Sequence, residues 1–300
     1  MNVTRRARSA RLRVSVTMGA VVLAVAGLVI ASQVAPAGAA PTATATGMTA
    51  VRHDDGGAKP TIVLEHGAWA DASSWDPVIE RLQAAGYTVY APPDPLGGLT
   101  SDAATLADFL ATISGPVVLV GHSYGGMVIT NATTGNPNVK ALVYVDAFIP
   151  AQGDTTFGLL GAQPGSCIAS AGAFNVVPYP GAPAGDADAY LKAGADGTYP
   201  GFARCFANGL PAGEAAMLAA IQRPIAYSAG SVPSGVPAWL AIPSWSVIGT
   251  ADHVIPPAEQ LFMSERAHAR ITEINAGHLS LLSDPRVVTS VILQAAHAAS

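Results

Sequence analysis

Residues 117–126 read VVLVGHSYGG, and residues 127–132 continue as MVITNA. The first apolar run predicts a buried strand and the second a helix, so Ser123 lies in the turn between them. A serine at the apex of such a turn has a strained backbone, and a side chain at Gly121 or Gly125 would collide with the neighbouring strand and helix. Free N–H groups of the helix favour a developing negative charge there. We therefore predict that Ser123 is a nucleophile; the alternative is a glycine-rich turn with an incidental serine.

Chain order predicts the partners of Ser123, because the acid and then the histidine follow the nucleophile in this type of fold. Residues 244–252 indicate a strand that runs into a loop at Asp252, and residues 270–274 indicate a strand followed by a loop with His278. Both side chains then lie beyond carboxyl ends of strands, where open parallel sheets bind ligands. We predict that His278 is the general base and that Asp252 orients it. Asp146, after the apolar strand 141–145, is the alternative acid.

An upstream segment predicts the oxyanion hole, which needs two N–H donors. The apolar strand 61–64 is followed by Glu65-His66-Gly67-Ala68-Trp69. One donor is the backbone N–H of Tyr124, directly after the nucleophile, and we predict that the second is the N–H of Ala68, where Gly67 allows a sharp turn. His66 is expected to be structural. Trp69 is a candidate for the substrate pocket, with simple packing as the alternative.

Four segments together resemble the α/β-hydrolase superfamily: HGAW at 66–69, GHSYGG at 121–126, GTADHVIP at 249–256 and GH at 277–278. Within it, the chain is similar to the branch of small bacterial carboxylesterases, plant methyl esterases and hydroxynitrile lyases. The resemblance runs from about residue 59 onward and is weak between about 150 and 243. It implies an α/β-hydrolase fold with a mostly parallel, doubly wound sheet and a cap insertion. It also implies a Ser-His-Asp triad, an acyl-enzyme intermediate and no cofactor.

Two departures from that branch favour ester hydrolysis. The hydroxynitrile lyases that resemble this chain carry threonine and lysine where it has Gly67 and Leu279. Leu279, a second candidate for the substrate pocket, is apolar and cannot stabilise a cyanide anion. Ser123 argues against haloalkane dehalogenases, which use an aspartate. The predicted function is hydrolysis of carboxylic esters by an exported serine hydrolase. The alternatives are a lactonase, a hydroxynitrile-lyase-like or haloperoxidase-like enzyme, and a non-catalytic ligand-binding homologue.

Composition agrees with one large α/β domain. Half of the 300 residues are hydrophobic and 12% are charged, so a sizeable core is expected. The formal net charge is −5. No basic patch with interleaved aromatic residues suggests nucleic-acid binding, and we expect a small-molecule ester as the partner.

The N-terminus predicts export. Five arginines precede an apolar stretch at 14–30, and the small residues Ala37-Gly38-Ala39 follow it. This pattern indicates a signal peptide over 1–39, with an uncleaved membrane anchor as the alternative. Removing it leaves ten basic and twenty acidic residues, a net charge of −10. The mature protein would begin with a flexible tether over 40–58 and would be secreted, with no stable membrane association.

The remaining chain divides into two core segments and an insertion. Strands and helices alternate over 59–149, and the core resumes over 244–300. Residues 150–243 are rich in Gly, Pro and Ala and predict a cap, with short helical patches near 187–193 and 213–221. Both cysteines lie in it, and an even cysteine count in an exported protein predicts a disulfide between Cys167 and Cys205. No His/Cys cluster has the spacing of a metal site.

Overall fold

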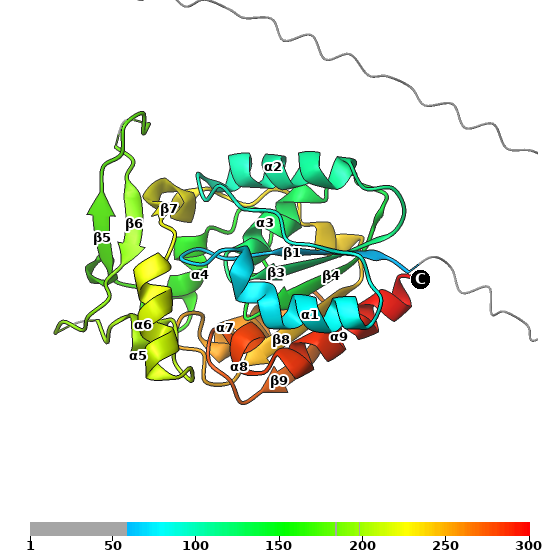
Figure 1. The fold of residues 1–300 in the computed structure, drawn as a ribbon. Helices are drawn as coiled ribbons and strands as arrows, with labels where there is room; N and C mark the ends of the chain where they lie inside the picture. The colour runs from blue at the N-terminus through cyan, green and yellow to red at the C-terminus, as the bar shows by residue number, and fades with distance from the viewer. Residues whose placement is uncertain (1–58, 184, 198) are drawn as a thin grey trace, which may run out of the picture. The chain divides into compact units, whose positions relative to one another are not determined.

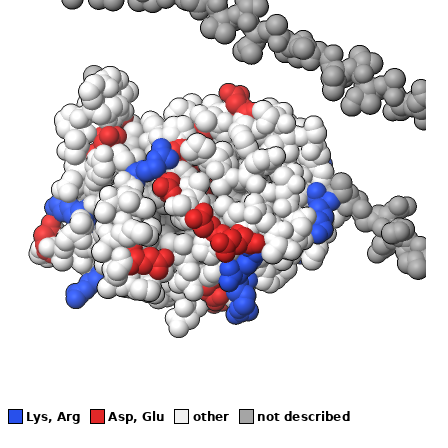
Figure 2. Space-filling view, viewed as in Figure 1, with Lys and Arg blue, Asp and Glu red and all other residues white. Residues whose placement is uncertain are grey.

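The computed structural model describes residues 59–183, 185–197 and 199–300. The predicted signal peptide (1–39) and tether (40–58) lie outside the described residues and stay predictions. Within the described part of the chain, no helix is both long and apolar enough to cross a membrane. Uncharged residues cover most of the face shown in Figure 2, and charged side chains are scattered across it.

A six-stranded sheet forms the centre of the fold, in the order β2-β1-β3-β4-β8-β9. All neighbouring strands pair in parallel. The strands are β1 (Thr61–Glu65), β2 (Val89–Tyr90), β3 (Val117–His122), β4 (Val139–Val145), β8 (Ser244–Gly249) and β9 (Arg270–Ile274). The order runs outward in both directions from β1 and β3, which confirms the doubly wound, mostly parallel sheet.

Helices cover both faces of this sheet (Figure 1). On one face, α1 (Asp76–Ala84) packs against α9 (Pro285–Ala298), and on the other α2 (Leu99–Ala111) packs against α3 (Gly125–Ala132). The remaining core elements are the 3₁₀ helix η1 (Ala72–Trp75), α7 (Pro257–Arg266) and α8 (Ser280–Ser283). A sheet covered on both faces buries whole strands, and every residue of β3 and β8 is buried.

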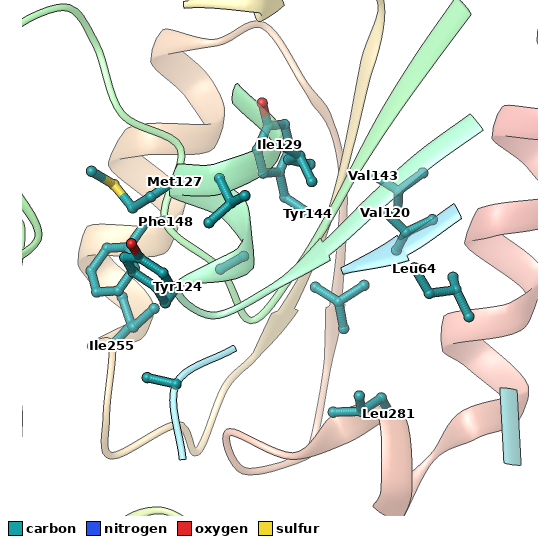
Figure 3. Close-up of a cluster of buried hydrophobic side chains, with 14 of the residues drawn as sticks. Leu64, Val120, Tyr124, Met127, Ile129, Val143, Tyr144, Phe148, Ile255 and Leu281 are labelled. Carbon is teal, nitrogen blue, oxygen red and sulfur yellow. The ribbon is translucent and has the colours of Figure 1, made fainter. Parts of the chain in front are cut away.

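Neighbouring strands align their apolar side chains in rows. Leu64 pairs with Val120 and Val120 with Val143, and Figure 3 shows the three side chains close together on β1, β3 and β4. All three are fully buried. Burying one such side chain contributes about 1.5–3 kcal/mol. Rows of this kind hold the carboxyl ends of the central strands at one level, and the loops there carry the predicted site residues.

The chain between β4 and β8 forms a separate cap. A three-stranded antiparallel sheet in the order β5-β6-β7 lies beyond one end of the large sheet (Figure 1). The cap elements are α4 (Thr156–Ala162), η2 (Ala171–Ala173), β5 (Phe174–Val177), β6 (Asp188–Leu191), α5 (Phe202–Cys205), α6 (Ala212–Ile221), β7 (Ile225–Ala226), η3 (Tyr227–Ser231) and η4 (Ala238–Leu240).

One predicted cap element is wrong and another is correct. The patch at 187–193, predicted as helical, contains the strand β6, whereas the patch at 213–221 is the helix α6. Along β6, Ala189 and Leu191 are buried and alternate with partly exposed residues, as in a strand with one covered face. The Gln222 amide also bonds both the N–H and the C=O of Leu191. Pairing with distant segments therefore overrides the helical tendency of an alanine-rich stretch.

The predicted disulfide joins Cys167 to Cys205, with Cα atoms 5.8 Å apart. Both cap segments joined by this disulfide also hydrogen-bond to His253, in the core loop after β8. The N–H of Cys167 donates to the carbonyl of His253 at 2.8 Å, and His253 Nδ1 lies 2.9 Å from the carbonyl of Arg204. The disulfide therefore ties two cap segments together beside the loop that follows β8.

Candidate active site

Ser123 lies in the turn between β3 and α3, and its backbone is in the left-handed region with a φ of 54°. That conformation is uncommon for a residue with a side chain. A Cβ on Gly121 would approach the carbonyl oxygen of Gly125 to 2.6 Å, and a Cβ on Gly125 would approach that of Glu65 to 2.8 Å. The sequence-based reason for these two glycines is therefore correct in kind. Strand, turn and helix pack too closely for side chains at either position.

A third glycine, Gly67, permits an equally close approach from the loop after β1. A Cβ at this position would lie 2.7 Å from the Cβ of Ser123 and 2.9 Å from the carbonyl oxygen of His122. Any other residue would push the loop away from the nucleophile. Sequence reasoning explained Gly67 only by a sharp turn. The contact with Ser123 became visible once β1 and β3 were aligned side by side.

Ser123, His278 and Asp252 form a chain of two hydrogen bonds. The Oγ of Ser123 lies 2.9 Å from Nε2 of His278, and Nδ1 of His278 lies 2.8 Å from Oδ2 of Asp252. All three residues are buried. The carboxylate accepts only, so it assigns the proton to Nδ1 and leaves Nε2 free to accept from the serine hydroxyl. This geometry suits removal of a proton from Ser123.

Asp252 is held by four donors. Its Oδ1 accepts from the N–H groups of Val254 and Ile255 at 2.7 and 3.1 Å, and its Oδ2 accepts from the amide of Gln260 at 2.7 Å and from His278. Burial raises the pKa of Asp252, and the Val254, Ile255 and Gln260 donors act against that rise. Sequence reasoning did not find Gln260. Its only signal was its place eight residues after Asp252, beside Glu259 near the start of α7.

Asp146, the alternative acid, makes no hydrogen bond to the imidazole of His278, which pairs with Asp252 instead. Its φ is 45°, its Oδ1 accepts from the N–H of Gly249 at 2.7 Å, and its Oδ2 accepts from both the N–H and the hydroxyl of Ser280. Burial and the neighbouring Asp252 raise its pKa. Asp146 therefore joins the end of β8, three residues before Asp252, to the start of α8, two residues after His278. It holds together the two loops that carry those residues.

The imidazole of His278 is enclosed by aromatic rings. The His122 ring lies 4.8 Å and the Phe206 ring 5.2 Å from it, measured between centroids. His122 Nε2 also lies 2.9 Å from the backbone carbonyl of His278. Burial lowers the pKa of His278 to about 3, so the ring is neutral near pH 7. Sequence reasoning did not find His122 or Phe206, because their approach depends on tertiary packing.

The two predicted oxyanion donors lie on one pocket with Ser123. Ala68 and Tyr124 both line it, and in the described structure neither backbone N–H donates to a protein acceptor. The Tyr124 hydroxyl donates to Asp102 at 2.9 Å, which ties the residue to α2. On the other loop, His66 Nε2 accepts from the N–H of Asp94 at 3.0 Å, which links the loop after β1 to the segment after β2.

Three carboxyl groups that sequence reasoning missed lie behind these donors. Glu65, Asp94 and Asp102 are all buried. Burial and mutual repulsion raise the pKa of Asp94 to about 7 and that of Glu65 well above its usual range. Groups that share protons in this way carry less negative charge than three free carboxylates. In the described part of the chain, no cluster of His, Cys, Asp and Glu is arranged to hold a metal ion.

The cap forms much of the wall of the pocket at Ser123, through side chains of α4, β5 and η3. Of the two predicted pocket residues, Trp69 lines this pocket. Leu279 lines a neighbouring cavity, together with Phe206 and Leu282. Trp69 borders both spaces, so its indole separates them.

Trp69 connects the loop of Ala68 to the cap. Its φ is 59°, and its Nε1–H donates to the carbonyl of Ala189 in β6 at 2.9 Å. Its ring stacks on Phe174 of β5 at 5.8 Å and meets Phe206 edge-on at 5.9 Å. A strained backbone at this point is stable only when surrounding contacts hold it. The cap thus supplies part of the support for the loop that carries Ala68.

Known proteins resemble this chain in sequence and in fold. The model of the alpha/beta hydrolase family matches residues 62–291. The carbendazim hydrolyzing esterase of Nocardioides sp. (strain SG-4G) is 38% identical over 111 residues, which are 33% of this chain and 46% of that protein. The pyrethroid hydrolase of Sphingobium wenxiniae is 36% identical over 115 residues, 33% of this chain and 41% of that protein. The matches thus span less than half of either relative.

A solved structure, that of polyneuridine aldehyde esterase, superposes with a TM-score of 0.63 at 20% identity, covering 79% of this chain and 98% of that one. At this identity the likeness shows the fold alone. Together with the family match, it confirms the superfamily resemblance drawn from the four sequence segments.

Proposed function

Because this chain belongs to the alpha/beta hydrolase family, we propose that it is a serine hydrolase that cleaves carboxylic esters through an acyl-enzyme intermediate. The observation that carries the proposal is the continuous hydrogen-bond chain from Ser123 through His278 to Asp252. Two partial relatives with esterase or hydrolase names support the same reaction class.

The reaction begins with transfer of the Ser123 proton to Nε2 of His278 as Oγ attacks the ester carbonyl carbon. The N–H groups of Ala68 and Tyr124 stabilise the tetrahedral oxyanion, and Asp252 stabilises the imidazolium. His278 then returns the proton to the departing alcohol, which leaves the acyl group on Ser123. A water molecule, deprotonated by His278, attacks the acyl-enzyme, and release of the acid restores the serine. A lactone is opened by the same steps.

The lyase alternative is disfavoured by charge. A hydroxynitrile lyase must stabilise cyanide, and no Lys or Arg lies among the described residues that line the pocket at Ser123. A non-catalytic homologue would have no need for the aligned base and acid. We also propose export, which is supported by the pattern of residues 1–39 and by the disulfide in the cap, since disulfides persist in oxidising compartments.

Hydrolysis of p-nitrophenyl butyrate by wild-type protein and by Ser123→Ala tests the proposal. The variant should fold normally and lose about a millionfold in kcat, as when the nucleophile of another triad enzyme is removed. Ser290→Ala, which replaces an exposed serine on α9, is the matched control and should retain full activity. A fluorophosphonate probe should label Ser123 in wild-type protein. Labelling of a different serine, or an active Ser123→Ala variant of unchanged melting temperature, would overturn the proposal.

A further inference from the structure

The residues that line the pocket at Ser123 indicate which class of ester the protein cleaves. Resting on the function proposed above, we propose that it binds an uncharged acyl group that contains an aromatic ring, and that Thr156 hydrogen-bonds an acceptor atom of that group. The class of substrate is therefore a neutral aryl-substituted carboxylic ester with an ether or carbonyl oxygen near the ring.

The pocket lies on the acyl side of the scissile bond. Ser123, Ala68 and Tyr124 line it, whereas His278 does not. In the proposed reaction the acyl carbon bonds to Ser123 and its oxygen faces the N–H groups of the other two residues. The departing alcohol takes its proton from Nε2 of His278 and so leaves on the histidine side. The space beside Ser123 and both donors is thus available to the acyl group.

A chain of aromatic rings forms the cap side of this space. Trp69 stacks on Phe174 at 5.8 Å, Phe174 meets Tyr227 edge-on at 6.2 Å, and Tyr227 lies 5.2 Å from Phe157. The four residues come from the loop after β1 and from β5, η3 and α4, and all line the pocket. Aromatic rings pack favourably against one another in stacked or edge-on arrangements. A planar ring in the acyl group would extend this chain.

Charge is excluded from the same space. Its described lining includes no Asp, Glu, Lys, Arg or His side chain. A charged acyl group would lose its hydration without gaining a partner, which is strongly unfavourable. A neutral acyl group meets no such cost.

Thr156 is the polar side chain of the lining that has an unused hydrogen-bonding group. Its Oγ1 is buried and has no hydrogen-bond partner among the described residues. The hydroxyl is not needed to cap α4, because Thr155 already accepts from the N–H of Gly158 at 3.0 Å. Threonine in a helix adopts two χ1 rotamers, which exchange its hydroxyl and methyl positions. A buried hydroxyl without a partner is unfavourable, so an acceptor on the substrate completes the site.

The size of the acyl group is limited by Phe157. A Cβ on Gly230 would lie 2.4 Å from the Phe157 ring, so glycine at this position leaves room for the ring. Gly230→Ala would force that ring to move. Because both residues line the pocket, the variant should change the preference between large and small acyl groups.

Esters that share the p-nitrophenol leaving group test the acyl class. Wild-type kcat/KM should be at least about tenfold higher for the 3-phenylpropanoate than for the butyrate, and about a hundredfold lower for the charged hydrogen succinate than for the butyrate. In Gly230→Ala, the ratio of kcat/KM for the 3-phenylpropanoate to kcat/KM for the butyrate should change, and the variant should still hydrolyse the butyrate. Equal rates on all three esters, with Ser123→Ala inactive, would overturn this inference and leave the proposed function intact. An active Ser123→Ala would overturn the function instead.

The role of Thr156 is tested with an isosteric pair. p-Nitrophenyl phenoxyacetate has an ether oxygen where the 3-phenylpropanoate has a methylene. We divide kcat/KM for the phenoxyacetate by kcat/KM for the 3-phenylpropanoate. In Thr156→Val this ratio should fall about three- to tenfold relative to wild type, as for one lost hydrogen bond. Thr105→Val, on the exposed side of α2, is the control and should leave the ratio unchanged. An unchanged ratio in Thr156→Val would overturn the assignment.

A binding measurement gives a readout that needs no catalysis. Calorimetry on Ser123→Ala should detect phenoxyacetamide, and adding Thr156→Val should weaken its binding about three- to tenfold while leaving 3-phenylpropanamide binding unchanged. Absence of binding by both amides would overturn the acyl-pocket assignment, whatever the esterase measurements show.

Discussion

The central sheet and the cap meet at Ser123 and are built in different ways. In β3 and β8 every residue is buried, whereas three of the four residues of β5 are exposed and α6 buries only Ala215. The sheet is held by burial and by regular pairing along its strands. The cap is held by individual links, which include the Cys167–Cys205 disulfide and the hydrogen bond from Trp69 to Ala189.

The core and the cap therefore have different proposed roles: the core carries the catalytic side chains, and the cap shapes the pocket that selects the substrate. The side chains proposed to perform bond cleavage come from the turn after β3 and from the loops after β8 and β9. Much of the pocket wall comes from the cap. Changes in the core should therefore act on kcat or on folding, whereas changes in the cap should act on stability and on the choice of substrate.

We expect the strongest contrast in kcat between variants of the two buried carboxylates beyond the core strands, Asp252 and Asp146. Asp252→Asn should lower kcat about 10⁴-fold, because the amide favours the wrong tautomer of His278. Asp146→Asn should cost about 1–3 kcal/mol in unfolding free energy, since its amide nitrogen would face the donors of Ser280, with a much smaller loss in kcat. Steady-state kinetics and denaturant unfolding of both variants check this. If Asp146→Asn lost most of its kcat and Asp252→Asn kept nearly all of it, the role assigned to Asp252 would be contradicted.

The next effect concerns the cap. Replacing both Cys167 and Cys205 by serine should lower the unfolding free energy by about 4 kcal/mol, the entropic value for a loop of this length. Hydrolysis of p-nitrophenyl acetate should continue below the new melting temperature, because neither sulfur belongs to the proposed triad. Thermal and denaturant unfolding measure the loss. If small-ester turnover disappeared in folded protein, the cap would contribute to the chemistry and the comparison would fail.

Replacing one glycine in the core and one in the cap by alanine compares how tightly the two regions are packed. A Cβ on Gly126 in α3 would lie 2.1 Å from the carbonyl oxygen of Phe148, which is backbone and cannot yield easily. Gly126→Ala should destabilise the protein by about 1–3 kcal/mol or more. Gly161 in α4 has open space around it, so Gly161→Ala should stabilise the helix by about 0.5–1 kcal/mol. Equal unfolding free energies for the two variants would show that the core packs less tightly than described.

The smallest effect is on pH dependence. Burial lowers the pKa of His278 to about 3, so kcat/KM should stay on its plateau well below the ordinary histidine value of about 6.5. Pre-steady-state rates between about pH 5 and 8 test this trend. A kcat/KM that halves near pH 6.5 would indicate a solvated His278.

Local patterns in the sequence were sufficient for the core. Apolar runs predicted the strands, and G-x-S-x-G identified the turn at Ser123, because strand, turn and helix propensities act over a few neighbouring residues. The same patterns placed Asp252 and His278 beyond strand ends. They failed at β6, whose partners β5 and β7 lie elsewhere in the chain.

The order of the core elements and the residues at their ends can be derived from the sequence. Three features depend on how the folded chain packs: which carboxylate reaches His278, why position 67 requires glycine, and that Leu279 lines a different cavity from Ser123. The direction of a loop side chain depends on contacts with segments more than a hundred residues away, as between His278 and Ser123. Such contacts have no local pattern in the sequence, so they are decided when the sheet, helices and cap pack together.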